Sequence, residues 1–124
     1  MANEEVLTYL QDVLDAINDV QSCFVDFPNR YDLFENDIMR RCVVERKVEI
    51  MGEAINRIRK KDSSVDIPNA RAIIDTRNRI IHAYDNVQPE FLWSLVIRHI
   101  PELKKDIERI IVDYEKLYNL ESNQ

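Results

Sequence analysis

Apolar residues recur at three- and four-residue spacing along most of the chain, which predicts amphipathic α-helices. We expect the first helix over residues 3–25, with Asn3 as its N-cap. Its apolar stripe consists of Val6, Leu10, Val13, Leu14, Ile17, Val20 and Phe24. Segment 26–35, which contains Pro28, is predicted to connect this helix to the next one.

The second helix is predicted to begin near Asn36 or Asp37 and to end near Lys60. It carries two apolar rows, so we expect it to contact other helices on two sides. A polar stripe lies between the rows and consists of Glu45, Glu49, Gly52 and Asn56. Gly52 is the only glycine of the chain, and a glycine inside a helix costs about 1 kcal/mol relative to alanine. We therefore expect another helix to approach closely at this position.

Prolines predict the later helix boundaries. After a loop over residues 61–67, Pro68 is placed in the first turn of a third helix, which we expect to end at Asp85 and Asn86. The apolar face of this helix is predicted to consist of Ala70, Ile73, Ile74, Ile81 and Tyr84. Pro89 is predicted to open a fourth helix, and Pro101 to break or kink the chain before a fifth.

The composition indicates one all-α domain over residues 1–124. A single glycine and four prolines in 124 residues leave little for β-hairpins, and they exclude a glycine-rich phosphate loop. Short connections between amphipathic helices then predict an antiparallel, up-and-down bundle of four to five helices.

Targeting and metal-binding signals are missing from the sequence. No apolar run is long enough to span a bilayer, and the acidic N-terminus does not resemble a secretory signal. The two cysteines, Cys23 and Cys42, lie far apart, so we expect reduced thiols and neither a disulfide nor a metal site. These features predict a cytoplasmic protein that needs no membrane and no cofactor.

The net charge of −6 argues against a protein that coats nucleic acid. The charge is unevenly distributed, however. Residues 1–39 carry −8, residues 40–79 carry +5, and residues 80–124 carry −3. A small cationic region on an acidic protein is consistent with local binding of a polyanion.

The basic region runs into segment 77–84, where Arg77, Asn78, His82 and Tyr84 interrupt an apolar helical repeat. At 100° per residue, Asn78 and His82 are neighbours on the helix surface, whereas Arg77 lies about 140° from His82. Arg77 and His82 could meet at one ligand if the long arginine side chain crossed the helix edge. Alternatively, a second copy of the chain could contribute across a two-fold axis, and the wheel geometry favours such a dimer.

These residue types suit cleavage of an RNA phosphodiester without a metal ion. An imidazole with an ordinary pKa of about 6.5 can act as base or acid near neutral pH. The guanidinium of Arg77 offers donors that match phosphate oxygens, and Asn78 could donate to the phosphate or orient His82. The product would be a 2′,3′-cyclic phosphate.

Structural interpretations compete with each catalytic one. Arg77 and His82 could be a solvated pair, and Tyr84 a core ring with its hydroxyl at the surface. Trp93 is predicted to be a core residue, and His99 to place a favourable charge near a helix end. Asp75 and Arg79 are predicted to form a surface pair at i,i+4 spacing.

Segment 77–84 resembles the RX4HXY motif of HEPN-domain ribonuclease toxins of the HepT type, and the resemblance extends over nearly the whole chain. Residues 9–14 resemble the family's opening helix, residues 48–54 its Ile-Gly-Glu-Ala segment, and residues 101–103 its Pro-x-Leu before the last helix. The chain departs from the family at Ala83, where many relatives have glycine. It also lacks the tryptophan that often follows the proline at position 68.

The resemblance implies an HEPN-like homodimer with a composite, metal-independent endoribonuclease site, in which Arg77 and His82 are catalytic. It further implies a type VII-like toxin–antitoxin pair. In such a pair Tyr84 would be modified with AMP by an MntA-type nucleotidyltransferase antitoxin that uses ATP and Mg²⁺. The added negative charge and bulk would block RNA.

Two alternatives remain beside the toxin. The chain could be a non-catalytic, substrate-binding subunit of a two-chain minimal nucleotidyltransferase, which would also form a dimer and bind such a partner. It could also be a purely structural bundle, in which case Tyr84 would never gain AMP.

Overall fold

The computed structural model describes residues 2–82 and 88–122, and these residues form helices and no strand. In chain order the elements are α1 (Ala2–Ser22), α2 (Tyr31–Glu35), α3 (Ile38–Lys61), α4 (Arg71–His82), α5 (Pro89–Ser94), the π-helical turn η1 (Leu95–His99) and α6 (Ile100–Ser122). The predicted all-α fold is confirmed.

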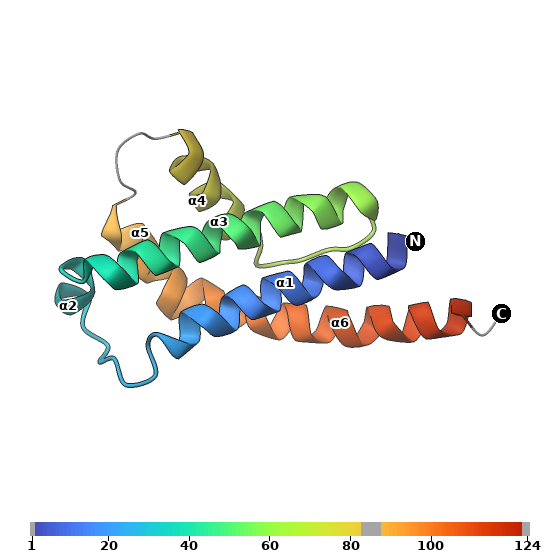
Figure 1. Cartoon of the computed structure of the whole chain (residues 1–124), viewed down its shortest axis with the longest axis horizontal. Coiled ribbons are helices and arrows are strands. Elements are labelled where there is room, and N and C mark those ends of the chain that lie inside the picture. The colour runs from blue at the N-terminus through green and yellow to red at the C-terminus, as the bar shows by residue number, and fades with distance from the viewer. Residues whose placement is uncertain (1, 83–87, 123–124) are drawn as a thin grey trace.

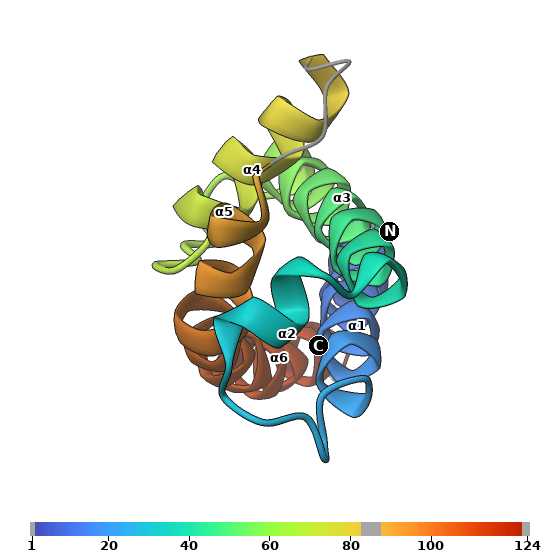
Figure 2. The same ribbon diagram turned by 90° about the vertical axis from the view of Figure 1, so that its left-hand side faces the viewer.

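Three long helices form the body of the bundle. α1 packs against both α3 and α6 and runs antiparallel to each of them (Figure 1). The apolar stripe predicted for α1 supplies much of the core, because Val6, Leu10, Val13, Ile17 and Val20 are fully buried there. α2 and α5 contact each other at one end of the bundle (Figure 2).

α4 is attached to the bundle at its N-terminal end and projects from it at its C-terminal end. Just before it, the backbone N–H and the side-chain Nδ2 of Asn69 donate to Asp106 Oδ2 of α6 at 3.2 and 2.7 Å. Asp106 is buried, so this contact fixes the start of α4 to the body. The helix then packs on α3, and its C-terminal end projects away from the bundle (Figures 1 and 2).

Three predicted boundaries are wrong. α1 ends at Ser22 and not near residue 25, so Phe24 lies in the turn after the helix. α4 begins at Arg71 and not at Pro68, which lies in the turn before the helix. The predicted connection 26–35 contains the short helix α2, which buries Phe34. The ring of Phe34 packs 5.1 Å, centroid to centroid, from that of Trp93. The tertiary contact of one aromatic side chain therefore orders a segment whose local sequence predicts a loop.

Pro101 interrupts the regular hydrogen bonding without ending the helical path. It has no N–H and sits in the first turn of α6, where a proline is tolerated. The preceding turn, η1, is widened, and the Ile100 N–H bonds to the Leu95 carbonyl. His99 is the last residue of η1, so it lies at the end of an element as predicted, although α6 continues the helical path from Ile100.

α3 begins where the sequence predicts, because Asp37 caps it. The Asp37 carboxylate accepts from the Arg40 N–H at 3.0 Å and pairs with the Arg40 guanidinium at 2.6 Å. These bonds from the backbone and then from the guanidinium lower the pKa of Asp37. Because the pKa is lower in the folded state, the ionised Asp37 stabilises the folded state at pH values above its unfolded-state pKa of about 3.9. This stabilisation is lost as the pH falls through the folded-state pKa.

We predict that Asp37→Ala lowers the free energy of unfolding by about 1 kcal/mol at pH 7, because α3 loses its cap. Asp37→Asn keeps a capping oxygen and should lose less than half as much. Urea unfolding at pH 7 and at pH 3 measures both effects. The difference between wild type and Asp37→Asn should shrink at the lower pH, and a constant difference would contradict the assignment.

Candidate RNA-cleavage site

The only glycine of the chain allows α4 to approach α3 through the side chain of Arg77. A Cβ built on Gly52 would lie 2.8 Å from both Cβ and Cγ of Arg77. Gly52 is buried, and no ordinary side-chain atom fits at that distance. The close approach predicted from the sequence is confirmed, and its partner is the arginine of the motif.

The Arg77 guanidinium lies between α3 and α4 and forms few hydrogen bonds with other residues of the protein. Arg77 Nε is one of two buried side-chain nitrogens without a hydrogen-bond partner among the described residues, the other being Arg41 Nε. The Arg77 Nη1 donates to Asn78 Oδ1 at 3.3 Å. A buried, charged donor without a partner is costly unless a ligand completes its hydrogen bonds. Because Nε is covered and Arg77 lines a cleft, an anion would reach this guanidinium through its terminal nitrogens.

A cleft of about 510 Å³ opens beside Arg77, between α4 and the C-terminal half of α3. Its lining residues are Glu53, Asn56, Arg57, Arg59, Lys60 and Arg77. Four of these six side chains are cationic and one is a carboxylate, so the cleft is positively charged. The cationic surface that begins at Arg77 thus continues along the C-terminal half of α3.

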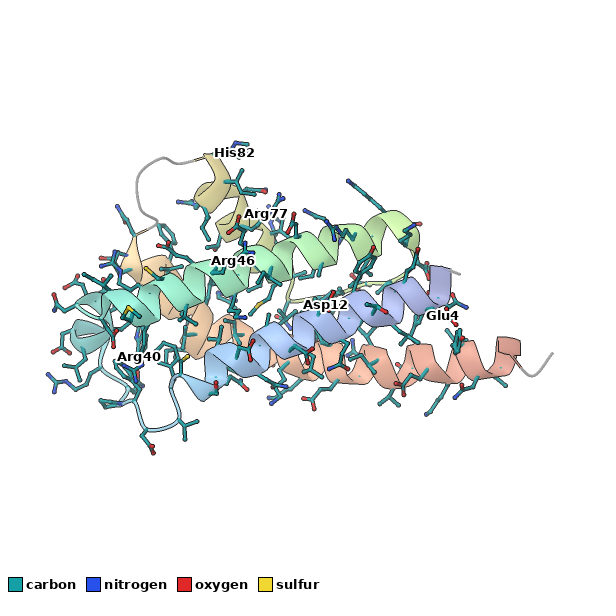
Figure 3. All side chains as sticks on the ribbon, in the orientation of Figure 1. Glu4, Asp12, Arg40, Arg46, Arg77 and His82 are labelled. Carbon is teal, nitrogen blue, oxygen red and sulfur yellow. The ribbon has the colours of Figure 1, made fainter. Side chains whose placement is uncertain are left out.

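His82 lies apart from Arg77. It is the last residue of α4, is exposed, and points away at the projecting end of the helix, whereas Arg77 lies against α3 (Figure 3). Asn78 is exposed one turn before His82. Tyr84, and the predicted end of the helix at Asp85 and Asn86, lie outside the described residues. Within one chain, the structure does not bring Arg77 and His82 together.

The end of α4 carries an exposed apolar surface. Ile81 was predicted to face the core, but 44% of it is exposed, which corrects that prediction. Phe91 of α5 is 41% exposed, and the Arg79 guanidinium lies 4.4 Å from the centre of its ring. Asp75 bonds instead with Arg71, at 3.9 Å, so the predicted Asp75–Arg79 pair is also wrong. His82 therefore sits next to apolar groups that face outward.

Other residues singled out in the sequence lie away from α4's projecting end. Trp93 is half-buried and packs against the core together with Phe24, Phe27 and Phe34. His99 is half-buried and lines a separate cleft with Pro68, Asn69, Arg71, Ala72 and Asp75. Within the described ranges, no group of three or more His, Cys, Asp or Glu side chains could hold a metal ion. None of the described helices combines the length and apolar character needed to cross a membrane.

Comparison with known proteins identifies the class. Residues 13–110 match the model of the family described as "Ribonuclease HepT-like". The chain is 34% identical over 110 residues to "Putative RNase MJ1380" of Methanocaldococcus jannaschii, an alignment that covers 87% of this chain and 98% of the relative. It is 33% identical over 109 residues to "Probable ribonuclease HepT" of Thermococcus cleftensis, covering 82% and 92%. No solved structure matches.

The chain belongs to the HepT-like ribonuclease family, and this membership assigns it to the ribonucleases.

Sequence reasoning missed one residue that positions the site, and it missed the partner of another. Asp106 anchors the turn before α4, but an aspartate among the apolar residues of α6 gave no sign of its partner 37 positions away. Gly52 was singled out, but the helical period alone could not show that Arg77 fills the space above it. The signal was present only as an unexplained glycine in a helix.

We predict that Gly52→Ala lowers the free energy of unfolding by about 1 kcal/mol or more. Overpacking costs about 1–3 kcal/mol and should outweigh the gain in helix propensity, about 1 kcal/mol. In the Arg77→Ala background the penalty should be smaller, because two of the three crowded atoms are gone. Denaturant unfolding of the four proteins gives this coupling. The neighbouring exposed change Glu53→Ala is the control, and a stabilising Gly52→Ala would refute the packing argument.

Proposed function

We propose that the chain is a metal-independent endoribonuclease whose active site contains Arg77 and His82. The observation that carries this proposal is the half-buried guanidinium of Arg77, whose Nε has no hydrogen-bond partner among the described residues and which lines a cationic cleft. A phosphodiester supplies the oxygens that such a fork of donors binds. The family supports the reaction class.

The reaction can be written with these side chains alone. The ribose 2′-oxygen attacks the adjacent phosphorus while its proton passes to a base. Arg77 stabilises the negative charge on the pentavalent phosphorane, and the bond from phosphorus to the 5′-oxygen breaks. An acid then protonates the leaving 5′-oxygen, which gives a 2′,3′-cyclic phosphate and a 5′-hydroxyl. His82 takes the 2′-proton as base, and the resulting imidazolium returns that proton to the leaving 5′-oxygen as acid; Asn78, one turn away, orients it.

The proposed active unit is a homodimer. Arg77 and His82 lie apart on α4, so one chain does not present both to the same phosphate (Figure 3). The projecting end of α4 carries exposed Ile81, and Arg79 of the same end contacts the exposed ring of Phe91. Burial of such apolar groups against a second copy favours association. Two copies joined through this surface would place His82 of each near Arg77 of the other.

We further propose that a partner regulates the site by modifying Tyr84. Tyr84 follows His82 by two residues, so AMP on its hydroxyl would place negative charge and bulk beside the phosphate site. An MntA-type nucleotidyltransferase antitoxin, using ATP and Mg²⁺, would transfer the AMP and make the chain the toxin of the pair. This proposal rests on the motif and on the family resemblance.

The catalytic proposal predicts that RNA cleavage persists in EDTA. Arg77→Ala and His82→Ala should each reduce the cleavage rate about 100-fold or more, because general acid–base and charge-stabilising groups usually contribute on that scale. Cleavage of labelled RNA is measured by gel electrophoresis. Arg71→Ala, on the same helix, and His99→Ala are matched controls that should retain activity. If wild type and both active-site variants cleave equally or not at all, the non-catalytic nucleotidyltransferase subunit becomes the better account.

The dimer proposal predicts complementation. When Arg77→Ala and His82→Ala chains are co-expressed with different tags and the mixed dimer is purified, one of its two sites has both residues intact. That dimer should recover about half of the wild-type activity, whereas either homodimer stays inactive. If Arg77 and His82 of the same chain form the site, the mixed dimer will be inactive as well.

Regulation through Tyr84 predicts a mass gain in whole AMP units when the chain is incubated with a neighbouring gene's nucleotidyltransferase, ATP and Mg²⁺. Intact-protein mass spectrometry detects the change, and RNA cleavage should fall as it accumulates. Tyr84→Phe should neither gain mass nor lose activity, while Tyr118→Phe should behave like wild type. A mass gain that persists in Tyr84→Phe would place the modification elsewhere.

A further inference from the structure

The basic segment 40–79 does not form one continuous patch. Five of its eleven cationic side chains form ion pairs with carboxylates, namely Arg40, Arg46, Lys47, Lys61 and Arg71. Four of the other six line the single cleft beside Arg77, where they form no ion pair with a described carboxylate. Most of the cationic side chains that this segment leaves without an ion pair are thus collected in one cleft.

The position of this cleft relative to the motif is informative. Arg57, Arg59 and Lys60 come from the C-terminal half of α3, and Arg77 comes from α4. Arg77 lines the cleft and His82 does not; His82 lies at the projecting end of α4 (Figure 3). Because Arg77 belongs both to the proposed active site and to the lining of the cleft, an RNA strand whose phosphate binds Arg77 would continue into the cleft.

The helix dipole accounts for only part of this cluster. Cationic side chains in the last turn of a helix are favoured by the partial negative charge there, which explains Arg59 and Lys60. Arg57 precedes that last turn and lies 5.9 Å from the ring centre of Tyr9, and Arg77 belongs to another helix. The dipole gives no reason for four cations from two helices to share one cleft that contains a single carboxylate.

We infer that this cleft, formed by Arg57, Arg59, Lys60 and Arg77, binds backbone phosphates of the RNA strand next to the cleaved bond. The inference rests on the proposed ribonuclease function and extends it to substrate binding. Its volume of about 510 Å³ lies within the range of about 300–1,000 Å³ found for ligand sites. Asn56 adds neutral hydrogen-bonding capacity, and the absence of an aromatic side chain from the lining indicates contact with phosphates and not base stacking.

An acidic protein segment would be the competing occupant. RNA is favoured because Arg77 belongs both to the cleft and to the motif. An RNA strand whose phosphate binds Arg77 for cleavage therefore already lies at the edge of the cleft. Contacts with phosphates also carry no sequence information. The cleft should therefore increase affinity for any single strand long enough to reach it.

Binding of a labelled 2′-O-methyl RNA oligonucleotide tests the inference, because this probe cannot be cleaved through a 2′-hydroxyl. The test variant is Arg59→Gln/Lys60→Gln in the full-length chain. The matched control is Arg109→Gln/Lys116→Gln on α6, which removes the same charge from exposed positions outside the cleft. Fluorescence anisotropy at several salt concentrations gives the dissociation constant and its salt dependence.

The test variant should bind about 10-fold more weakly at about 0.1 M salt. The slope of the logarithm of the binding constant against the logarithm of the salt concentration should become shallower by about 1.4, because each of the two lost phosphate contacts on a single strand contributes about 0.7. The control should change affinity less than about 2-fold. Equal losses in both variants, or no loss in the test variant, would overturn the inference and leave an acidic protein as the occupant.

Cleavage of unmodified RNA by the wild-type chain separates the two proposals. If the chain cleaves RNA while the test variant binds the probe as wild type does, the ribonuclease proposal stands and the cleft assignment fails. If the chain does not cleave RNA but its binding depends on Arg59 and Lys60, the cleft assignment stands as an RNA-binding site and the catalytic proposal fails.

Discussion

The contact of Arg77 with Gly52 is the constraint on which the site depends. A helix interior normally disfavours glycine, yet here the missing Cβ makes room for the first carbons of an arginine. The stem of Arg77 is therefore packed like a core residue while its guanidinium reaches a cleft. Packing a charged side chain in this way fixes the direction of its donors, which is what recognition of phosphate requires.

The rest of the bundle holds this contact in place. α3 is capped at Asp37 and packs along α1, while the hydrogen bonds from Asn69 to the buried Asp106 tie the start of α4 to α6. α4 is thus anchored at its beginning and packed at Arg77, and it projects beyond that point (Figure 2). The projecting end carries Asn78 and His82 together with exposed Ile81, which fits the proposal that a second copy completes the site.

Much of this could be predicted from the pattern of the sequence, because apolar periodicity and caps are local. The start of α3, the opening of α5 at Pro89 and the need for a close neighbour at Gly52 all followed from such rules. Two features could not, since they depend on contacts between distant residues. α2 exists because Phe34 packs against Trp93, and the chain passes Pro101 through a widened turn. For the site, the wheel separated Arg77 from His82, but only the fold gathers Arg57, Arg59 and Lys60 beside Arg77.

The central claim is that the Arg77 guanidinium binds the phosphate of RNA. The side-chain Nε–H resonance of Arg77, assigned by its loss in Arg77→Lys, reports this most directly in a ¹⁵N-correlated NMR spectrum. On titration with uncleavable 2′-O-methyl RNA, it should shift as the phosphate bonds to the terminal nitrogens of the same guanidinium, while the Arg109 resonance on α6 stays in place. A saturating titration in which the Arg77 resonance does not move, or moves no more than that of Arg109, would contradict the account.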